Sequence, residues 1–203
     1  MSRSISYFCT RQHGWLAAAL LSASLTSTTV ARADDGCGGV KLPTTAKAFG
    51  LDLKRNGVGI RSATFLNIHV YVAALYAEHP SRKAAPLLKA DEPKSIVLHF
   101  KRDVSREDMV EALDEAMENN AGSAYASTRK HLKSFSKLLP TLKEGSRLSL
   151  TYRKGHGLEV FYNGRSRGVE QDDAFGNLLF RAFIGKEPAD EDLKEGLLGG
   201  PCD

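Results

Sequence analysis

The side chains that most often carry chemistry do not form a known catalytic or metal-binding spacing in this sequence. No two histidines have the HxH or HExxH spacing that is typical of a metal site. Ser62, Ser105 and Ser123 lack the GxSxG setting of a hydrolase nucleophile. The glycines around Val58 and around His156 are interpreted as turn glycines, because neither group opens a helix after a strand as a phosphate-binding loop does. We therefore expect no bound metal and no cofactor.

The first 33 residues have the pattern of a secretory signal. Two arginines precede an apolar run from Trp15 to Leu25, and small residues follow as far as Ala31-Arg32-Ala33. The run is too short to anchor the chain in a bilayer, so we expect cleavage after residue 33. An uncleaved signal anchor is the alternative. The sequence thus predicts a periplasmic or secreted protein that has no integral membrane segment after cleavage.

The formal net charge of +4 belongs mostly to this signal. Residues 1–33 hold three arginines and no acidic residue, so 25 basic residues face 24 acidic ones in residues 34–203. The remaining net charge is only +1. A domain this close to neutrality lacks the basic surface typical of nucleic-acid binding, and we expect no nucleic-acid partner.

Two cysteines, Cys37 and Cys202, remain after the signal. In an oxidising compartment, two cysteines suggest one disulfide, and the two ends of a domain often lie close in space. We therefore expect a Cys37–Cys202 bond that ties both ends together; two unpaired thiols on loose tails are the alternative. Their spacing fits neither a CxxC redox pair nor a zinc site.

The periodicity of residues 34–203 predicts one α+β domain. Residues 34–46 are glycine-rich and aperiodic, so they are interpreted as an irregular lead-in to a domain of residues 47–203. Asn56-Gly57 is the strongest hairpin signal, and a new strand is expected near Val58. In residues 65–76 the even positions are apolar, whereas Asn67, His69 and Tyr71 give the other face polar character.

The rest of the chain alternates between strands and helices. Further strands are expected at 94–100, 147–153, 158–162 and 165–169. Helices are expected at 81–89, 172–184 and 189–198, and two more lie between the strands: one begins at residue 105, and the next ends at about residue 139. Strands followed by two helices, then strands followed by two more helices, favour an antiparallel sheet with helices packed on one face.

Four segments resemble the chalcone isomerase-like family in the same order along the chain. Asn56 to Arg61 resembles its glycine-rich opening and arginine, and Val70 to Tyr76 the strand that follows. His99 to Ser105 resembles its strand-to-helix junction, and Phe175 to Lys194 its closing helices. Together they cover about residues 47–199. The resemblance implies an open-faced β-sandwich, a large antiparallel sheet under a layer of helices, with a cleft between them.

The family includes plant isomerases that close a flavanone ring, fatty-acid-binding relatives, and bacterial members of unclear role. The resemblance matches Arg61 to the arginine that anchors the substrate of the isomerase. Tyr71 and Ala182 stand where the isomerase has threonines. Met109, Ala112 and Ala116 align with its tyrosine, lysine and asparagine, although Asn119 or Asn120 could shift into these positions. Most proton-handling groups are therefore absent, and we expect no chalcone isomerase activity.

The remaining groups suit the binding of a carboxylate. A guanidinium can hold a carboxylate with two hydrogen bonds, and the Tyr71 hydroxyl can add a third. His69, on the polar strand face, could join them or serve the structure alone. Ten residues of straight strand span roughly 33 Å, so Arg61 and Tyr71 meet only if the chain turns back between them. Otherwise Arg61 pairs with a surface acid beside a tight turn.

Three functions follow as hypotheses. The first is a binding protein for a small amphipathic acid such as a fatty acid, with Arg61, Tyr71 and His69 as ligand contacts. The second is an isomerase or intramolecular lyase, acting on an unsaturated carbonyl compound, in which Arg61 stabilises an oxyanion and Tyr71 donates a proton. The third is a structural or interaction module of the cell envelope.

Overall fold

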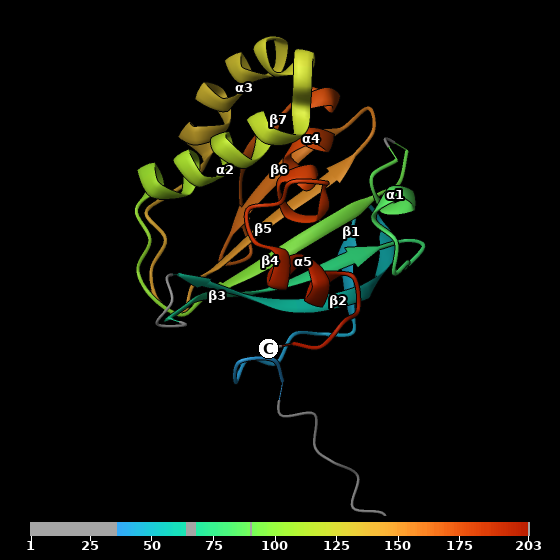
Figure 1. The fold of residues 1–203 in the computed structure, drawn as a ribbon, viewed down its shortest axis with the longest axis vertical. Helices are drawn as coiled ribbons and strands as arrows, with labels where there is room; N and C mark the ends of the chain where they lie inside the picture. The colour runs from blue at the N-terminus through green and yellow to red at the C-terminus, as the bar shows by residue number, and fades with distance from the viewer. Residues whose placement is uncertain (1–35, 64–67, 90, 203) are drawn as a thin grey trace, which may run out of the picture. The chain divides into compact units, whose positions relative to one another are not determined.

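A computed structural model describes residues 36–63, 68–89 and 91–202 of the chain. The expected signal at residues 1–33 lies outside the described residues. Seven strands form one antiparallel sheet in which each strand pairs with the next along the chain (Figure 1). They are β1 (Thr45–Ala48), β2 (Leu51–Ala63), β3 (Ile68–Ala77), β4 (Lys94–Phe100), β5 (Arg147–Arg153), β6 (Gly157–Tyr162) and β7 (Arg165–Glu170).

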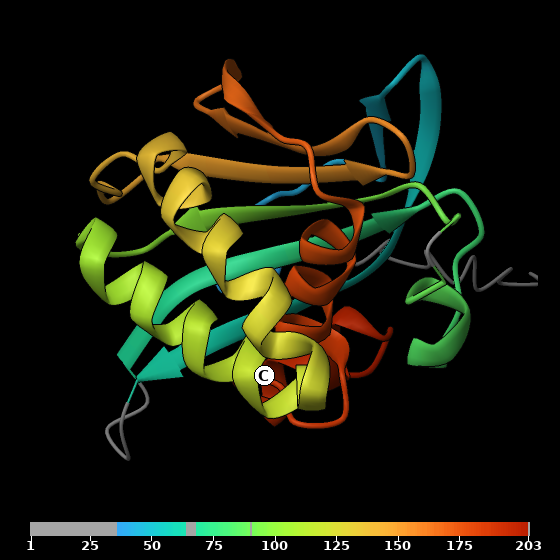
Figure 2. The ribbon, with the colours of Figure 1, turned by 90° about the horizontal axis from the view of Figure 1, so that it is seen from above.

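A layer of helices covers one face of this sheet, as Figure 2 shows from above. The helices are α1 (Ala84–Leu87), α2 (Arg106–Ala121), the 3-10 turn η1 (Gly122–Ala124), α3 (Tyr125–Leu138), α4 (Asp173–Ile184) and α5 (Glu191–Leu197). The predicted α+β fold, a large antiparallel sheet with helices on one face, is confirmed. Each of α2, α4 and α5 begins at a side-chain cap, in which Ser105, Asp172 or Asp190 accepts a hydrogen bond from the backbone N–H three residues on.

The face of β3 that was expected to be polar instead packs against the helices. Tyr71, Ala73 and Leu75 belong to the main core between the sheet and the helix layer, and Tyr71 is only 6% exposed. The opposite face carries Val72 and Tyr76, which are also buried, in a second cluster. The expectation of one wet face was therefore wrong, because both faces of this strand are covered.

The turn expected at Asn56-Gly57 was also wrong. The first hairpin turns at Phe49-Gly50, where both residues have positive φ (52° and 77°), and β2 then runs unbroken through Asn56. Asn56 is the extra residue of a β-bulge in β2. Its side chain donates to Leu197 O (2.7 Å) and accepts from Ser81 N (2.6 Å). The dipeptide thus joins α5 and the β3–β4 connection to the sheet.

The segment before β1 crosses the sheet face that the helices leave open. Val40 and Leu42 pack there against Leu53 and Ile60 of β2. Cys37 and Cys202 form the predicted disulfide, with Cα atoms 5.8 Å apart and 165 residues of separation in the sequence. The bond holds the segment after residue 36 beside the carboxyl end of the chain (Figure 1).

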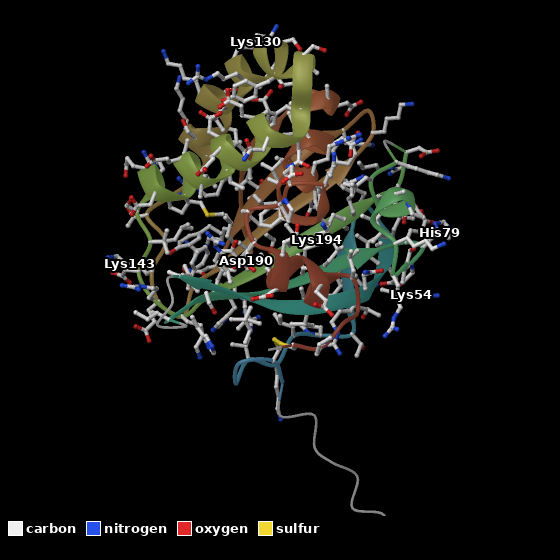
Figure 3. All side chains as sticks on the ribbon, in the orientation of Figure 1. Lys54, His79, Lys130, Lys143, Asp190 and Lys194 are labelled. Carbon is white, nitrogen blue, oxygen red and sulfur yellow. A yellow bond between two sulfur atoms is a disulfide. The ribbon has the colours of Figure 1, made fainter. Side chains whose placement is uncertain are left out.

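Most lysines lie at the surface, as Lys54, Lys130 and Lys143 do in Figure 3, but Lys94 is fully buried. Its Nζ lies 4.9 Å from the centre of the Tyr152 ring and donates to Lys89 O at 2.8 Å. Burial lowers the pKa of Lys94 from 10.5 to about 8, against the opposing effect of Glu92 and Asp91. The main core therefore contains a cation that is costly to bury.

Lys94→Met is expected to stabilise the protein at neutral pH. Below pH 8 Lys94 is charged in both the folded and the unfolded chain, so the cost of burying its charge, ~3 kcal/mol, opposes folding in full. Between about pH 8 and 10.5 the folded protein has released a proton that the unfolded chain still binds, and wild-type stability rises with pH. Urea unfolding should show the advantage of the variant shrinking across this window, with exposed Lys54→Met as the control. An advantage that does not change with pH would contradict this account.

Candidate functional site

Arg61 and Tyr71 lie opposite each other on neighbouring strands. Strand β2 ends at Ala63, β3 begins at Ile68, and the antiparallel pairing places Arg61 directly across from Tyr71. The turn-back that the sequence required is therefore present. Both residues face the helix layer, since the flanking pair Ile60 and Val72 belongs to the cluster on the other face.

The guanidinium of Arg61 is held at the amino end of α5. Its Nη1 donates to Ala189 O (2.5 Å) and to Asp190 Oδ2 (2.9 Å), and the side chain is 29% exposed. Asp190, labelled in Figure 3, is only 14% exposed and also caps α5 through Oδ1. Arg61 thus pairs with an acid, as one alternative held, but with a largely buried acid beneath the helices rather than a surface one.

The hydroxyl of Tyr71 lies within the same electrostatic environment. Burial raises the pKa of this phenol well above its usual range; the charge of Arg61 opposes the rise and that of Asp190 adds to it. The hydroxyl is therefore protonated at neutral pH and is a donor. It makes no hydrogen bond to another of the described residues.

A small hollow of about 120 Å³ lies beside Arg61. Its walls come from α2 and from the α4–α5 connection, and include Ala112, Ala116, Asn119 and Pro188. Small-molecule sites usually enclose about 300–1,000 Å³, so this hollow admits a head group but not a long tail. The two alanines are those that the resemblance aligned with proton-handling positions, so neither of these two positions carries a titratable group, whereas Glu115 of α2 places a carboxylate on the same wall.

Asn120 holds the α4–α5 connection against α2. Its Oδ1 accepts from Glu187 N (3.1 Å), and its Nδ2 donates to Ala116 O (2.8 Å) and to Glu187 O. The connection carries Ala189, whose carbonyl accepts from Arg61. The side chain of Asn120 thus fixes one wall of the hollow.

Comparison with known proteins agrees with this fold. The family model described as chalcone isomerase-like matches residues 35–199. The chain belongs to the chalcone isomerase-like family. A crystal structure of an Arabidopsis thaliana fatty-acid binding protein is similar, with a TM-score of 0.63 and 21% identity, over 79% of this chain and 92% of that one. No curated protein matches the sequence.

The third predicted contact lies at the end of β3. His69 pairs with Ser62 across a register shift, and its side chain is half-buried. Neither His69 nor Tyr71 is among the residues that line the hollow beside Arg61. Arg61 and Tyr71 are thus brought together in this family member, whereas a contact with His69 stays a prediction.

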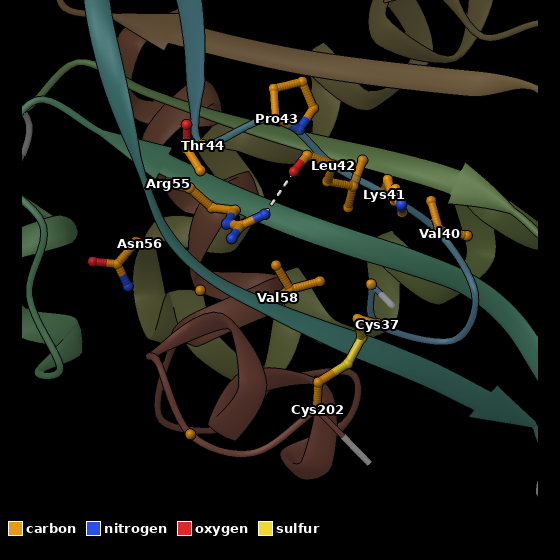
Figure 4. Close-up of a pocket in the computed structure, with 13 residues that line it drawn as sticks. Cys37, Val40, Lys41, Leu42, Pro43, Thr44, Arg55, Asn56, Val58 and Cys202 are labelled. Atoms are coloured by element: carbon orange, nitrogen blue, oxygen red, sulfur yellow. Dashed lines mark hydrogen bonds between the residues drawn. A yellow bond between two sulfur atoms is a disulfide. The ribbon is translucent and has the colours of Figure 1, made fainter. Parts of the chain in front are cut away.

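A second hollow, of about 670 Å³, lies on the opposite side of the sheet (Figure 4). It is bounded by the lead-in, by β2 and by the Cys37–Cys202 disulfide. Arg55 crosses it and donates to Leu42 O at 2.6 Å. These contacts attach the lead-in to the sheet, and the hollow is separate from Arg61.

Two other polar groups deserve comparison with hydrolase sites. Gly164 to Gly168 has the GxSxG spacing, but Ser166 lies in the β6–β7 hairpin and its Oγ donates to Glu159 Oε1 at 3.0 Å. His131 contacts Glu170 Oε1 at 2.8 Å, yet Ser134 donates to this carboxylate rather than to the imidazole. Neither arrangement pairs a serine with an imidazole, because both hydroxyls donate to a carboxylate.

Within the described ranges, no three potential ligands gather in a way that could hold a metal ion. Nor is any helix among the described residues both long and apolar enough to cross a membrane.

Asp190 stabilises the fold through two bonds that substitution can separate. Asp190→Ala removes the cap of α5 and the partner of Arg61, so we expect a loss of ~1–3 kcal/mol in the free energy of unfolding. Asp190→Asn keeps a capping oxygen and should cost less than half as much. Chemical denaturation measures both, with exposed Asp192→Ala as the control. Equal losses for the two variants would show that the cap contributes nothing.

Proposed function

We propose that this protein is an exported binding protein for a small amphipathic carboxylic acid, similar to a fatty acid, and that it lacks chalcone isomerase activity. The observation that carries the proposal is that Arg61 lines a hollow between the sheet and the helices and lies directly across from Tyr71 on the neighbouring strand. A fatty-acid binding protein with the same fold supports the ligand class.

The donors available at the site suit a carboxylate. Only Nη1 of Arg61 is bonded among the described residues, so Nε and Nη2 remain as donors that point along a common edge of the guanidinium. The protonated hydroxyl of Tyr71 adds a further donor in the same environment. A ligand carboxylate can accept all three without displacing Asp190, which already occupies the other side of Arg61.

The tail of the ligand requires more space than the free protein offers. A hollow of about 120 Å³ accommodates a carboxylate and a few carbon atoms. A longer chain enters only when the α4–α5 connection or α2 moves outward, and the bonds of Asn120 oppose that movement. Ligand binding is therefore expected to open the wall that Asn120 fixes.

Isomerase or lyase chemistry is the alternative and has less support. Proton transfer needs a titratable or hydroxyl group within reach of the reacting atom. Of the α2 residues that line the head-group hollow, Ala112 and Ala116 carry no such group and Glu115 is the one that titrates, while the raised pKa of Tyr71 makes this phenol a weaker proton donor. No observation favours a purely structural role in the envelope.

Arg61→Ala is expected to weaken the binding of dodecanoate about 10- to 100-fold, because bonds to a charged group are lost. Binding of dodecanol should change less than about twofold, since the alcohol carries no charge for Arg61 to attract. Titration calorimetry measures both ligands, and Arg82→Ala, which removes an exposed arginine bonded to Gly199 O, is the control.

Asp190→Asn provides an opposite test at the same site. It removes a negative charge beside the ligand carboxylate and keeps the cap of α5, so dodecanoate should bind several-fold more tightly. If Arg61→Ala weakens acid and alcohol equally, or if Asp190→Asn leaves dodecanoate affinity unchanged, the head-group role is wrong.

If the protein is exported, its mature form should lack the signal at residues 1–33. When the full sequence is expressed in a bacterium with a periplasm, the intact mass should correspond to residues 34–203 less two hydrogens for the disulfide. Cys37→Ser should add one reactive thiol at Cys202 and lower the melting temperature, because the bond restricts a very long loop in the unfolded chain. A protein that keeps residues 1–33 and stays in the cytoplasm would refute export.

A further inference from the structure

The wall that α2 contributes to the hollow beside Arg61 carries an acid and an amide as well as the two alanines. Ala112, Glu115, Ala116 and Asn119 follow one another at steps of three, one and three residues, so they share one side of the helix. Ala116 is only 3% exposed, whereas Glu115 and Asn119 are exposed. The alanines therefore form the deeper part of this wall, and the carboxylate and the amide lie at its rim.

The fold makes no use of either side chain at the rim. Neither the carboxylate of Glu115 nor the amide of Asn119 forms an ion pair or a hydrogen bond with another of the described residues. The neighbouring acid on the helix differs, because Asp114 accepts from the Tyr125 hydroxyl and lies 3.7 Å from Arg129. Glu115 thus presents an unpaired, solvent-accessible carboxylate beside the hollow.

The net charge around the hollow is negative. Among the described residues that line it, Arg61 is the only base and Glu115 the only acid. Arg61 is already paired with Asp190 at 2.9 Å, so the charge of Glu115 is left without compensation. Helix α2 as a whole carries six acidic side chains and one basic side chain. A simple fatty acid would therefore bring a further negative charge into a negative environment, which opposes its binding.

We propose that the acid bound at the Arg61 site is a 2-amino acid with an apolar side chain, and that Glu115 selects it. The inference rests on the proposed function, in which Arg61 holds the ligand carboxylate. The ammonium group on the adjacent carbon donates to the carboxylate of Glu115 and to the amide oxygen of Asn119. Such a head group has no net charge, and each of its two charges meets an opposite charge in the wall.

The size of the hollow agrees with this ligand class. Its volume of about 120 Å³ admits a carboxylate, the adjacent carbon with its ammonium group, and a few further carbon atoms. The start of the apolar side chain lies against Ala112, Ala116 and Pro188, which supply the apolar part of the lining. A short side chain is thus accommodated while Asn120 still holds the wall, and only a longer one requires the wall to open.

Octanoate and 2-aminooctanoate differ only in the amino group, and titration calorimetry in about 0.1 M salt measures both. The wild-type protein should bind 2-aminooctanoate more tightly. Glu115→Gln keeps the shape of the side chain and removes its charge. It should weaken 2-aminooctanoate about three- to fivefold, the range of a partly exposed ion pair, and tighten octanoate about twofold. Both effects should shrink in about 1 M salt, where the screening length falls to ~3 Å.

Two further variants separate this inference from the role of Arg61. Glu107→Gln removes the same charge from α2 about 12 Å away, beyond the screening length of ~10 Å in 0.1 M salt, and should leave the ratio of the two affinities unchanged. Arg61→Ala should weaken both ligands, because both present a carboxylate. A wild-type preference for octanoate, or a Glu115→Gln variant with an unchanged ratio, overturns the selection by Glu115 and leaves the Arg61 role standing. If neither ligand binds, both are wrong.

Discussion

The direct contact between α5 and the backbone of β2 is the constraint on which the Arg61 site depends. Gly59 and Gly196 face each other across it: a Cβ on Gly59 would lie 2.5 Å from Leu193 O, and one on Gly196 2.5 Å from Val58 O. Neither glycine can carry a side chain without moving the helix, since the opposing atoms belong to backbone. With α5 in place, Asp190 at its start reaches Arg61, which follows Gly59 by two residues on the same face of the strand.

Asp190 explains how a half-buried guanidinium is tolerated without a ligand. An unpaired charge in a partly apolar environment loses hydration that nothing replaces, so it is costly. Here one carboxylate oxygen caps the helix and the other neutralises Arg61. The same carboxylate lowers the positive potential that a second acid meets. The site therefore combines stability in the free protein with a limit on its affinity, a balance that a neutral partner at this position would shift.

Both faces of the sheet are covered, one by helices and the other by a short irregular segment. Helices cover one face over most of the sheet, whereas the other is covered near β2 and β3 by the short segment with Val40 and Leu42. Such a segment has few backbone bonds of its own. The disulfide and the hydrogen bond from Arg55 to Leu42 O hold it in place. Because Cys202 follows α5 closely, this bond also secures the end of the chain that carries the Arg61 partner.

Local signals in the sequence determined much of the fold. The structure contains the strands expected at 147–153, 158–162 and 165–169 and the helices expected from 105 and from 172 to 184. Strand alternation and helix capping act within a few residues, so the sequence alone can show them. The resemblance matched Arg61 and Tyr71 to two positions of the isomerase site, and the return of β3 along β2 brings Tyr71 opposite Arg61.

The tertiary structure alone decided those features in which a contact with a distant element overrides the local preference of the sequence. Asn56-Gly57 has the composition of a turn, yet it became a bulge because α5, some 140 residues later, occupies the space a side chain would need and bonds to Asn56. Tyr71 appeared to face water because its neighbours Asn67 and His69 are polar, but the helix layer covers it. The partner of Arg61 likewise depends on how β2 and α5 meet, which no pattern of neighbouring residues encodes.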